Sequence, residues 1–154
     1  MGGAVARGLA HGTKVATADI YVSNPSTAKL EALKSEHPEI NTTTNNCDAA
    51  AAADLVILAV KPWKVEQVIE EIKPHIDYSH QAVASMVGGL GIGQLSAWLD
   101  KGDGKLPATY IIIPNTAVAT MSSMTFIASA RTTAEQEVAL VEIFDELGKA
   151  MLVE

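Results

Sequence analysis

The run Asp-Leu-Val-Ile-Leu-Ala-Val-Lys-Pro at residues 54–62 constrains the fold of this chain more than any other segment. Its six consecutive apolar residues are typical of a strand that is buried on both faces of a parallel sheet. The run then turns polar at Lys61 and is broken at Pro62. Because open α/β sheets bind ligands at the carboxyl ends of their strands, the run predicts an α/β fold with a ligand beside that end.

Apolar, strand-like runs alternate along the chain with segments of helical period, which is typical of consecutive βαβ units. We therefore predict a doubly wound, mainly parallel sheet of the Rossmann type in a single domain spanning residues 1–154. Strands are expected at 20–23, 40–43, 54–62, 82–87, 110–113, 124–130 and 150–153. Helices are expected at 2–9, from 24–27 with Pro25 near the first turn as far as Pro38, at 47–53, 65–72 and 90–99, and from Thr133 to a cap at Gly148.

The composition excludes several classes of protein. The 154 residues, 48% of them apolar, suffice for one domain with a hydrophobic core. The net charge of −7 and the absence of a Lys/Arg cluster argue against a nucleic-acid surface. No apolar run approaches the roughly 20 residues that cross a bilayer, and the single Cys47 excludes an internal disulfide. We expect a cytoplasmic protein that acts on a small molecule, without a membrane partner. No metal site is expected, because metal-ligand spacing is absent from His11, His37, His75 and His80.

Two glycines, Gly2 and Gly3, precede the first helical segment, as they would at the end of a dinucleotide-binding fingerprint. A helix that starts there offers N–H groups and a positive dipole end to a pyrophosphate. Helix packing or flexibility would explain the two glycines equally well. The first strand of a doubly wound sheet is central, and it is missing from this sequence. We therefore expect a gap with an exposed strand edge on either side, left by truncation or filled by a strand from elsewhere.

The strand at 20–23 ends at Ser23 and Asn24, without the acidic residue that would bind the adenosine ribose of NAD. Hydroxyl and amide groups can donate hydrogen bonds to a 2′-phosphate, which favours NADP, although NAD remains possible. A turn followed by a helix cap would use the same two residues. Both interpretations stay open.

Further segments extend this pattern. They are MGGAVARGL at the start, Ser-Asn-Pro at 23–25, Asn46, the run at 54–62, Gly88-Gly89, Pro-Asn-Thr at 114–116 and Met124-Thr125. In this combination and spacing they resemble the nucleotide-binding domain of pyrroline-5-carboxylate reductase, the enzyme of the last step of proline synthesis. The resemblance covers essentially the whole chain. It implies NADPH as the cofactor and hydride transfer to a cyclic C=N bond that yields L-proline.

The resemblance also implies roles for individual residues. Asn46 is expected to contact a cofactor ribose, residues 59–62 to line the nicotinamide side, and the backbone at 87–89 to approach the cofactor closely. The expected cofactor-binding residues are Gly2, Gly3, Ser23, Asn24, Asn46, Ala59, Val60, Lys61, Pro62, Val87, Gly88 and Gly89, and those expected beside the substrate are Asn115 and Thr116. Ordinary turns and strand-end charges would explain each residue singly. No catalytic proton donor is identified.

Some positions depart from the family pattern. Ile111 stands where an arginine is usual, Ala117 replaces a proline, and Met121 and Ser123 replace glycines, while the usual Ala-Ala-Gly turn is Val-Gly-Gly at 87–89. These changes leave the fold prediction intact and bear on how the substrate is handled.

The family's C-terminal helical domain, which supplies the dimer interface and completes the substrate pocket, is also missing from the sequence. We therefore expect a cofactor domain from a longer, homo-oligomeric protein, with little activity alone. Two alternatives remain open: a prephenate-type or deazaflavin-linked NADP oxidoreductase on the same fold, or a non-catalytic nucleotide-binding relative.

Overall fold

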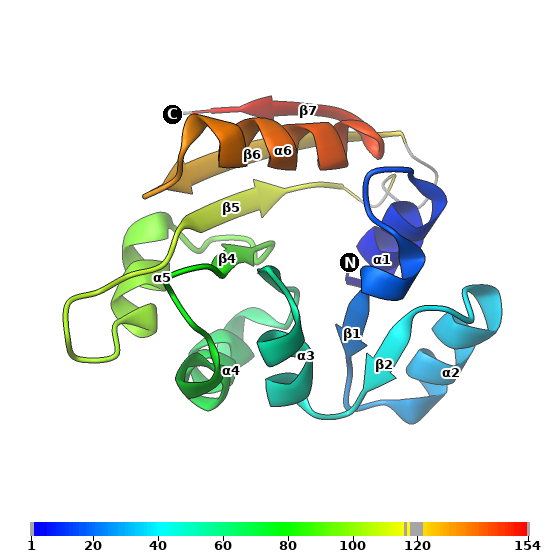
Figure 1. The fold of residues 1–154 in the computed structure, drawn as a ribbon, viewed down its shortest axis with the longest axis horizontal. Coiled ribbons are helices and arrows are strands. Elements are labelled where there is room, and N and C mark those ends of the chain that lie inside the picture. The colour runs from blue at the N-terminus through cyan, green and yellow to red at the C-terminus, as the bar shows by residue number, and fades with distance from the viewer. Residues whose placement is uncertain (1, 116, 118–121, 154) are drawn as a thin grey trace.

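The computed structural model describes residues 2–115, 117 and 122–153, which form two β-sheets with helices around them (Figure 1). Strands β1 (Tyr21–Ser23) and β2 (Asn41–Thr43) make one parallel pair. The second sheet has the order β3-β4-β5-β6-β7, with β3 (Leu55–Leu58), β4 (Ala82–Ser85), β5 (Thr109–Ile113), β6 (Ser123–Ala130) and β7 (Gly148–Leu152). The α-helices are α1 (Gly2–His11), α2 (Thr27–Glu36), α3 (Asn46–Ala52), α4 (Val65–Ile72), α5 (Ile92–Leu99) and α6 (Ala134–Asp145).

Helices cover both faces of the five-stranded sheet. On one face, residues of α3, α4 and α5 share a core with Val83 of β4, whereas on the other face the neighbouring Ala84 packs with residues of α1 and α6. This alternation is expected of a strand buried on both faces. Three of the four pairings in this sheet are parallel, and β6 runs antiparallel to β5. The predicted mainly parallel, Rossmann-type α/β fold is confirmed.

The predicted gap lies between β1 and β3. Within the described part of the chain, β1 pairs only with β2 and β3 only with β4, so each has an unpaired edge. Helix α1 lies between the two sheets (Figure 1). Its Val5 is buried with Ala84 and Tyr110 of the larger sheet, and its Ala6 is buried with Ile20, next to β1. The helix therefore joins two sheets that share no strand.

Several predicted boundaries near the ends of elements are wrong. The strand expected over 54–62 is shorter, because β3 ends at Leu58 and a 3₁₀ turn, η2 (Pro62–Lys64), starts at the proline. Gly148 does not cap α6. The cap is Glu146, and Gly148 is instead the first residue of β7, so that strand begins earlier than predicted.

Helix α2 begins slightly later than predicted. Its N-cap is Ser26, whose hydroxyl accepts a hydrogen bond from the Lys29 N–H, so Pro25 lies ahead of the cap rather than in the first turn. The predicted capping box of α6 is confirmed: the Thr133 hydroxyl accepts from the Gln136 N–H, and the Gln136 side chain accepts from the Thr133 N–H.

Glu146, at the end of α6, holds the loop that follows α1. Its carboxylate accepts hydrogen bonds from the Thr13 N–H at 2.8 Å, the Thr13 hydroxyl at 2.7 Å and the Lys14 N–H at 2.7 Å. Because these donors favour the charged form, the bonds from Thr13 above all hold the pKa of Glu146 below its ordinary value. The carboxylate thus links two segments that are far apart in the sequence.

We expect Glu146→Gln to destabilise the protein at neutral pH and to have little effect in acid. The pKa of Glu146 is lower in the folded than in the unfolded state, so the charged group contributes stability above the unfolded value of about 4.3. That contribution is lost as the pH falls through the lower, folded value. Urea unfolding of both proteins at pH 7 and near pH 3 measures the change, with the exposed Glu31→Gln as control. A Glu146→Gln effect of equal size at both pH values would contradict this account.

Candidate cofactor-binding site

Helix α1 begins against the segment that follows β3. A Cβ atom on Gly2 would lie 3.0 Å from the Ala59 Cβ, so a larger residue would push the helix start and that segment apart. A Cβ on Gly3 would meet only the Nη1 atom of Arg7, the end of a flexible side chain on the same helix. The first-turn N–H groups of α1, which have no partner within a helix, are therefore held near the carboxyl end of β3.

Ser23 and Asn46 contact each other directly. The Ser23 hydroxyl donates to Asn46 Oδ1 at 2.6 Å, and both residues are partly buried. Asn24 Oδ1 accepts from the Ser26 N–H at 2.8 Å, so Asn24 makes the turn before α2. Asn45, rather than Asn46, caps α3, through a bond from the Cys47 N–H. The Asn46 side chain is thus directed to the end of β1.

The segment after β3 is mostly exposed. Ala59, Lys61 and Pro62 are exposed, whereas Val60 is partly buried and packs against the core that α3, α4 and α5 share. Where the structure describes side chains, the Lys61 ammonium takes part in no ion pair or hydrogen bond. The segment therefore offers an anchored backbone and an unpaired cation.

The turn after β4 also exposes its backbone. Val87 is buried, and its N–H donates to the Ser85 hydroxyl at 3.1 Å. A Cβ on Gly88 or Gly89 would meet nothing within 4 Å, so a ligand could approach this backbone closely. Gly89 has a φ of +79°, which strains any residue that carries a side chain, and Gly88 has no such requirement.

Asn115 follows β5 and is tied to β6. Its N–H donates to the Ser123 hydroxyl at 3.3 Å, and its Oδ1 accepts from the Ala117 N–H at 3.0 Å. Ser123 is buried, so its hydroxyl anchors the turn from within the sheet. The sequence did not predict that Ser123 anchors this turn. The only indication of a special role was that a serine stands where a glycine is usual. Thr116 and Met121 lie outside the described residues.

The strand register brings three of these segments to one edge of the sheet. Leu58 of β3 pairs with Ser85 of β4, which pairs with Ile111 of β5. The segments that follow, at 59–62, 87–89 and 114–115, therefore leave the sheet side by side. Ser23 and Asn46 form a second group across the gap, and α1 spans the two sheets.

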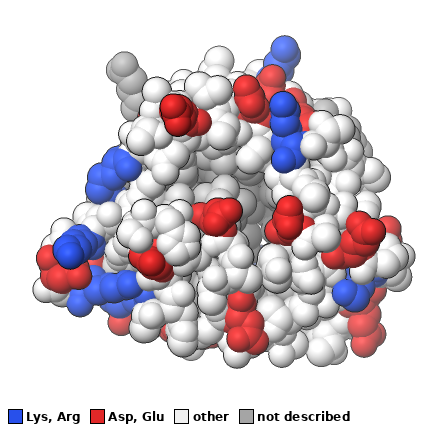
Figure 2. All heavy atoms as spheres, in the orientation of Figure 1, with Lys and Arg blue, Asp and Glu red and all other residues white. Residues whose placement is uncertain are grey.

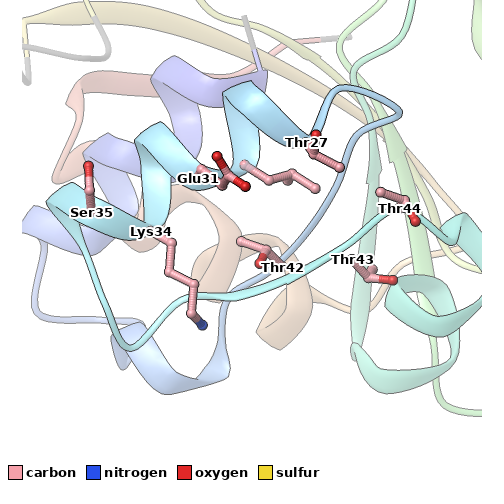
Figure 3. A pocket seen from close by; sticks show the side chains of 8 residues that line it. Thr27, Glu31, Lys34, Ser35, Thr42, Thr43 and Thr44 are labelled. Carbon is pink, nitrogen blue, oxygen red and sulfur yellow. The ribbon is translucent and has the colours of Figure 1, made fainter.

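A surface hollow of about 680 Å³ lies apart from this edge, between α2 and β2 (Figure 3). It is lined by Thr27, Leu30, Glu31, Lys34, Ser35, Thr42, Thr43 and Thr44. It lies along β2, an edge strand, and none of the predicted site residues line it. The candidate site therefore lies at the strand ends rather than in this hollow.

Acidic side chains are scattered across the face shown in Figure 2 and basic ones lie mainly toward its edges, with no continuous basic patch in view. Among the described residues, no group of three or more His, Cys, Asp or Glu side chains is arranged to hold a metal ion. The helices described are all too short or too polar to cross a membrane.

Comparisons with known proteins bear on the family and the fold of the chain. A family model described as "NADP oxidoreductase coenzyme F420-dependent" matches residues 1–89, more than half of the chain. Pyrroline-5-carboxylate reductase of Escherichia coli is 29% identical over 154 residues, covering 99% of this chain and 55% of the relative. Pyrroline-5-carboxylate reductase 3 of Danio rerio is 29% identical over 152 residues, covering 97% and 49% respectively. The chain thus spans about half the length of these relatives.

Solved structures share the fold. Plasmodium falciparum pyrroline carboxylate reductase with NADP bound has a TM-score of 0.84 at 22% identity, over 100% of this chain and 54% of that one. Prephenate dehydrogenase from A. aeolicus, in complex with hydroxyphenyl propionate and NAD+, has a TM-score of 0.68 at 16% identity, over 100% and 56%. The expected resemblance to pyrroline-5-carboxylate reductases is confirmed, and the chain belongs to the family of NADP oxidoreductases described as coenzyme F420-dependent.

Proposed function

We propose that this chain forms the NADP-binding part of a reductase that converts 1-pyrroline-5-carboxylate to L-proline. The observation that carries the proposal is the common sheet edge at which β3, β4 and β5 end, with the start of α1 held against Ala59. Relatives named pyrroline-5-carboxylate reductase, at 29% identity, support this choice of substrate.

The phosphates and the adenosine ribose of the cofactor fit the residues at the start of α1 and at the end of β1. The α1 first turn at Gly2 and Gly3 would bind the pyrophosphate, since its N–H groups and dipole favour an anion. Asn24 Oδ1 is engaged with the Ser26 N–H, so Asn24 would offer its Nδ2 amide to a 2′-phosphate, beside Ser23. Asn46, held by Ser23, would contact a ribose.

The reacting end of the cofactor fits the segments that follow β3, β4 and β5. Residues 59–62 would form the wall on the nicotinamide side, and the open backbone at 87–89 would allow the cofactor to approach closely. Asn115, positioned by Ser123, would lie beside the substrate. When bound, NADPH supplies the hydride for the C=N bond. The task of the chain is to orient the two reactants and to exclude water.

We expect Asn24→Asp to weaken NADPH binding about tenfold while leaving NADH binding unchanged or improved. The aspartate can still accept the Ser26 N–H bond, so the turn before α2 is kept. Its negative charge would repel a 2′-phosphate and favour ribose hydroxyl groups. Calorimetric titration with both cofactors measures the two affinities. Equal weakening for NADPH and NADH would place Asn24 away from the 2′-phosphate.

Turnover tests the reaction itself. NADPH oxidation in the presence of 1-pyrroline-5-carboxylate, followed by the dihydronicotinamide absorbance, should yield proline in equal amount. The assay should use this chain and any longer protein that contains it, because the chain spans only about half of its relatives. Tight NADPH binding without turnover by a longer protein would contradict the reductase proposal. It would favour the interpretation that the protein is a non-catalytic, nucleotide-binding relative.

A second reaction is favoured by the description of the family model. This reaction is hydride exchange between NADP and a deazaflavin. It needs the same NADP-binding part of the protein. Oxidation of the reduced deazaflavin by NADP+, without activity on 1-pyrroline-5-carboxylate, would support this alternative.

A further inference from the structure

We propose that Trp63 is the stacking surface for the adenine ring of the cofactor, an inference that rests on the NADP-binding function proposed above. Trp63 is 77% exposed, more than any other large apolar side chain that the structure describes. It lies in η2 (Pro62–Lys64), directly after the wall at 59–62. An aromatic ring left in water beside a nucleotide site is suited to stacking on a base.

The charge of the neighbouring lysines indicates which ring of the cofactor Trp63 meets. Trp63 lies two residues after Lys61 and one before Lys64, and both lysines are exposed. Among the described side chains neither ammonium makes an ion pair, although the chain carries a net charge of −7. In NADPH the 2′-phosphate lies on the adenosine half, the pyrophosphate joins the two halves, and the reduced nicotinamide ring is neutral. Lys64, which follows Trp63 on the side away from the wall at 59–62, therefore fits the adenosine half.

The exposure of Trp63 also indicates that it meets the adenine ring. Adenine takes no part in the reaction and can bind with one face against a protein ring and the other toward solvent. Trp63 would then contribute to affinity and leave the reacting geometry unchanged.

The chain provides its own control. It has two tryptophans, and the other, Trp98, is partly buried on α5 against the core. In Trp98→Phe the only indole is Trp63, so NADPH should reduce its emission saturably by energy transfer. Calorimetry should show that Trp63→Ala raises the Kd for NADPH about tenfold, that Trp63→Phe has a much smaller effect, and that Trp98→Phe has none. Far-ultraviolet circular dichroism and melting curves would show that the variants fold.

Fragments of the cofactor locate the contact. Trp63→Ala should weaken binding of adenosine 2′,5′-bisphosphate by the same factor and leave binding of reduced nicotinamide mononucleotide unchanged. Loss confined to the nicotinamide fragment, or wild-type NADPH affinity in Trp63→Ala, would overturn this inference while the proposed function stands. Absence of saturable NADPH binding by all four proteins would instead overturn the proposed function.

Discussion

Gly148→Ala is expected to lower the free energy of unfolding by about 4 kcal/mol, because the new methyl group has no space and the backbone is strained. Gly148 pairs with Ser123 at the start of β7. A Cβ on Gly148 would lie 1.9 Å from the Ser123 carbonyl oxygen and 2.4 Å from the Ser123 nitrogen. These are backbone atoms, so they cannot move aside as a flexible side chain would. In addition, φ at Gly148 is +135°.

A matched variant separates the clash from the strain. Gly104 also has a positive φ, +74°, but a Cβ there would meet nothing within 4 Å. Gly104→Ala should therefore cost only about 1 kcal/mol, the strain of the backbone conformation alone. Urea unfolding followed by circular dichroism measures both. If the two variants lose the same stability, the close approach of β7 to Ser123 is not present in solution.

The properties of Gly148 also show why element types were easier to predict than their ends. A glycine at the end of a helix predicts a cap with positive φ. The residue does have a positive φ, but it uses this conformation to start β7 rather than to end α6. The preference of glycine for a positive φ is local, so the sequence shows it. The start of β7 is instead set by pairing with β6, and local sequence patterns do not show that pairing.

The end of β3 has a similar explanation. Buried parallel strands have apolar residues in succession, so the run from Leu55 predicted a strand correctly. Ala59 and Val60 are apolar too, and nothing in their type shows that pairing with β4 stops at Leu58. The sequence shows an interruption of the strand only at Pro62, where η2 starts.

At the candidate site, as elsewhere in the fold, local chemistry was predictable and long-range contacts were not. The open backbone at Gly88 and Gly89 follows from the two glycines. The bond between Ser23 and Asn46 joins residues 23 positions apart, and the Glu146 carboxylate reaches Thr13 across 133 positions. Ser, Asn and Glu are common surface residues. Only the folded arrangement shows which of them meet.

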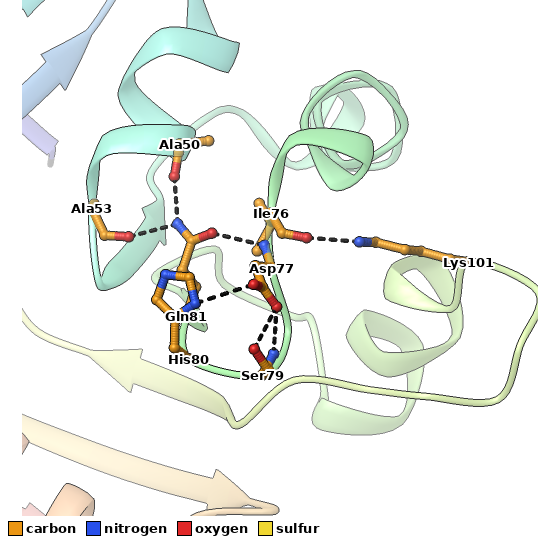
Figure 4. A network of polar contacts seen from close by, with 8 residues as sticks. All are labelled: Ala50, Ala53, Ile76, Asp77, Ser79, His80, Gln81 and Lys101. Carbon is orange, nitrogen blue, oxygen red and sulfur yellow. Dashed lines mark hydrogen bonds and ion pairs between the residues drawn. The ribbon is translucent and has the colours of Figure 1, made fainter.

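Gln81→Leu is expected to lower the free energy of unfolding by about 3 kcal/mol, because it leaves three backbone groups without their partner. The Gln81 side chain is 4% exposed and lies between α3 and the turn before β4 (Figure 4). Its Nε2 donates to the carbonyl oxygens of Ala50 at 2.7 Å and Ala53 at 2.6 Å, and its Oε1 accepts from the Asp77 N–H at 2.7 Å. Leucine has a similar volume, so the lost hydrogen bonds dominate the change.

Two further variants test that cause. Gln81→Glu keeps an acceptor for the Asp77 N–H but places a carboxylate against two carbonyl oxygens. Its destabilisation should therefore be larger at neutral pH than in acid, where a protonated carboxyl can donate to one of them. Gln94→Leu, on the exposed side of α5, should change stability by no more than about 0.5 kcal/mol. Urea unfolding at two pH values measures all three. If Gln81→Leu were as stable as Gln94→Leu, the end of α3 would be satisfied by water rather than by Gln81.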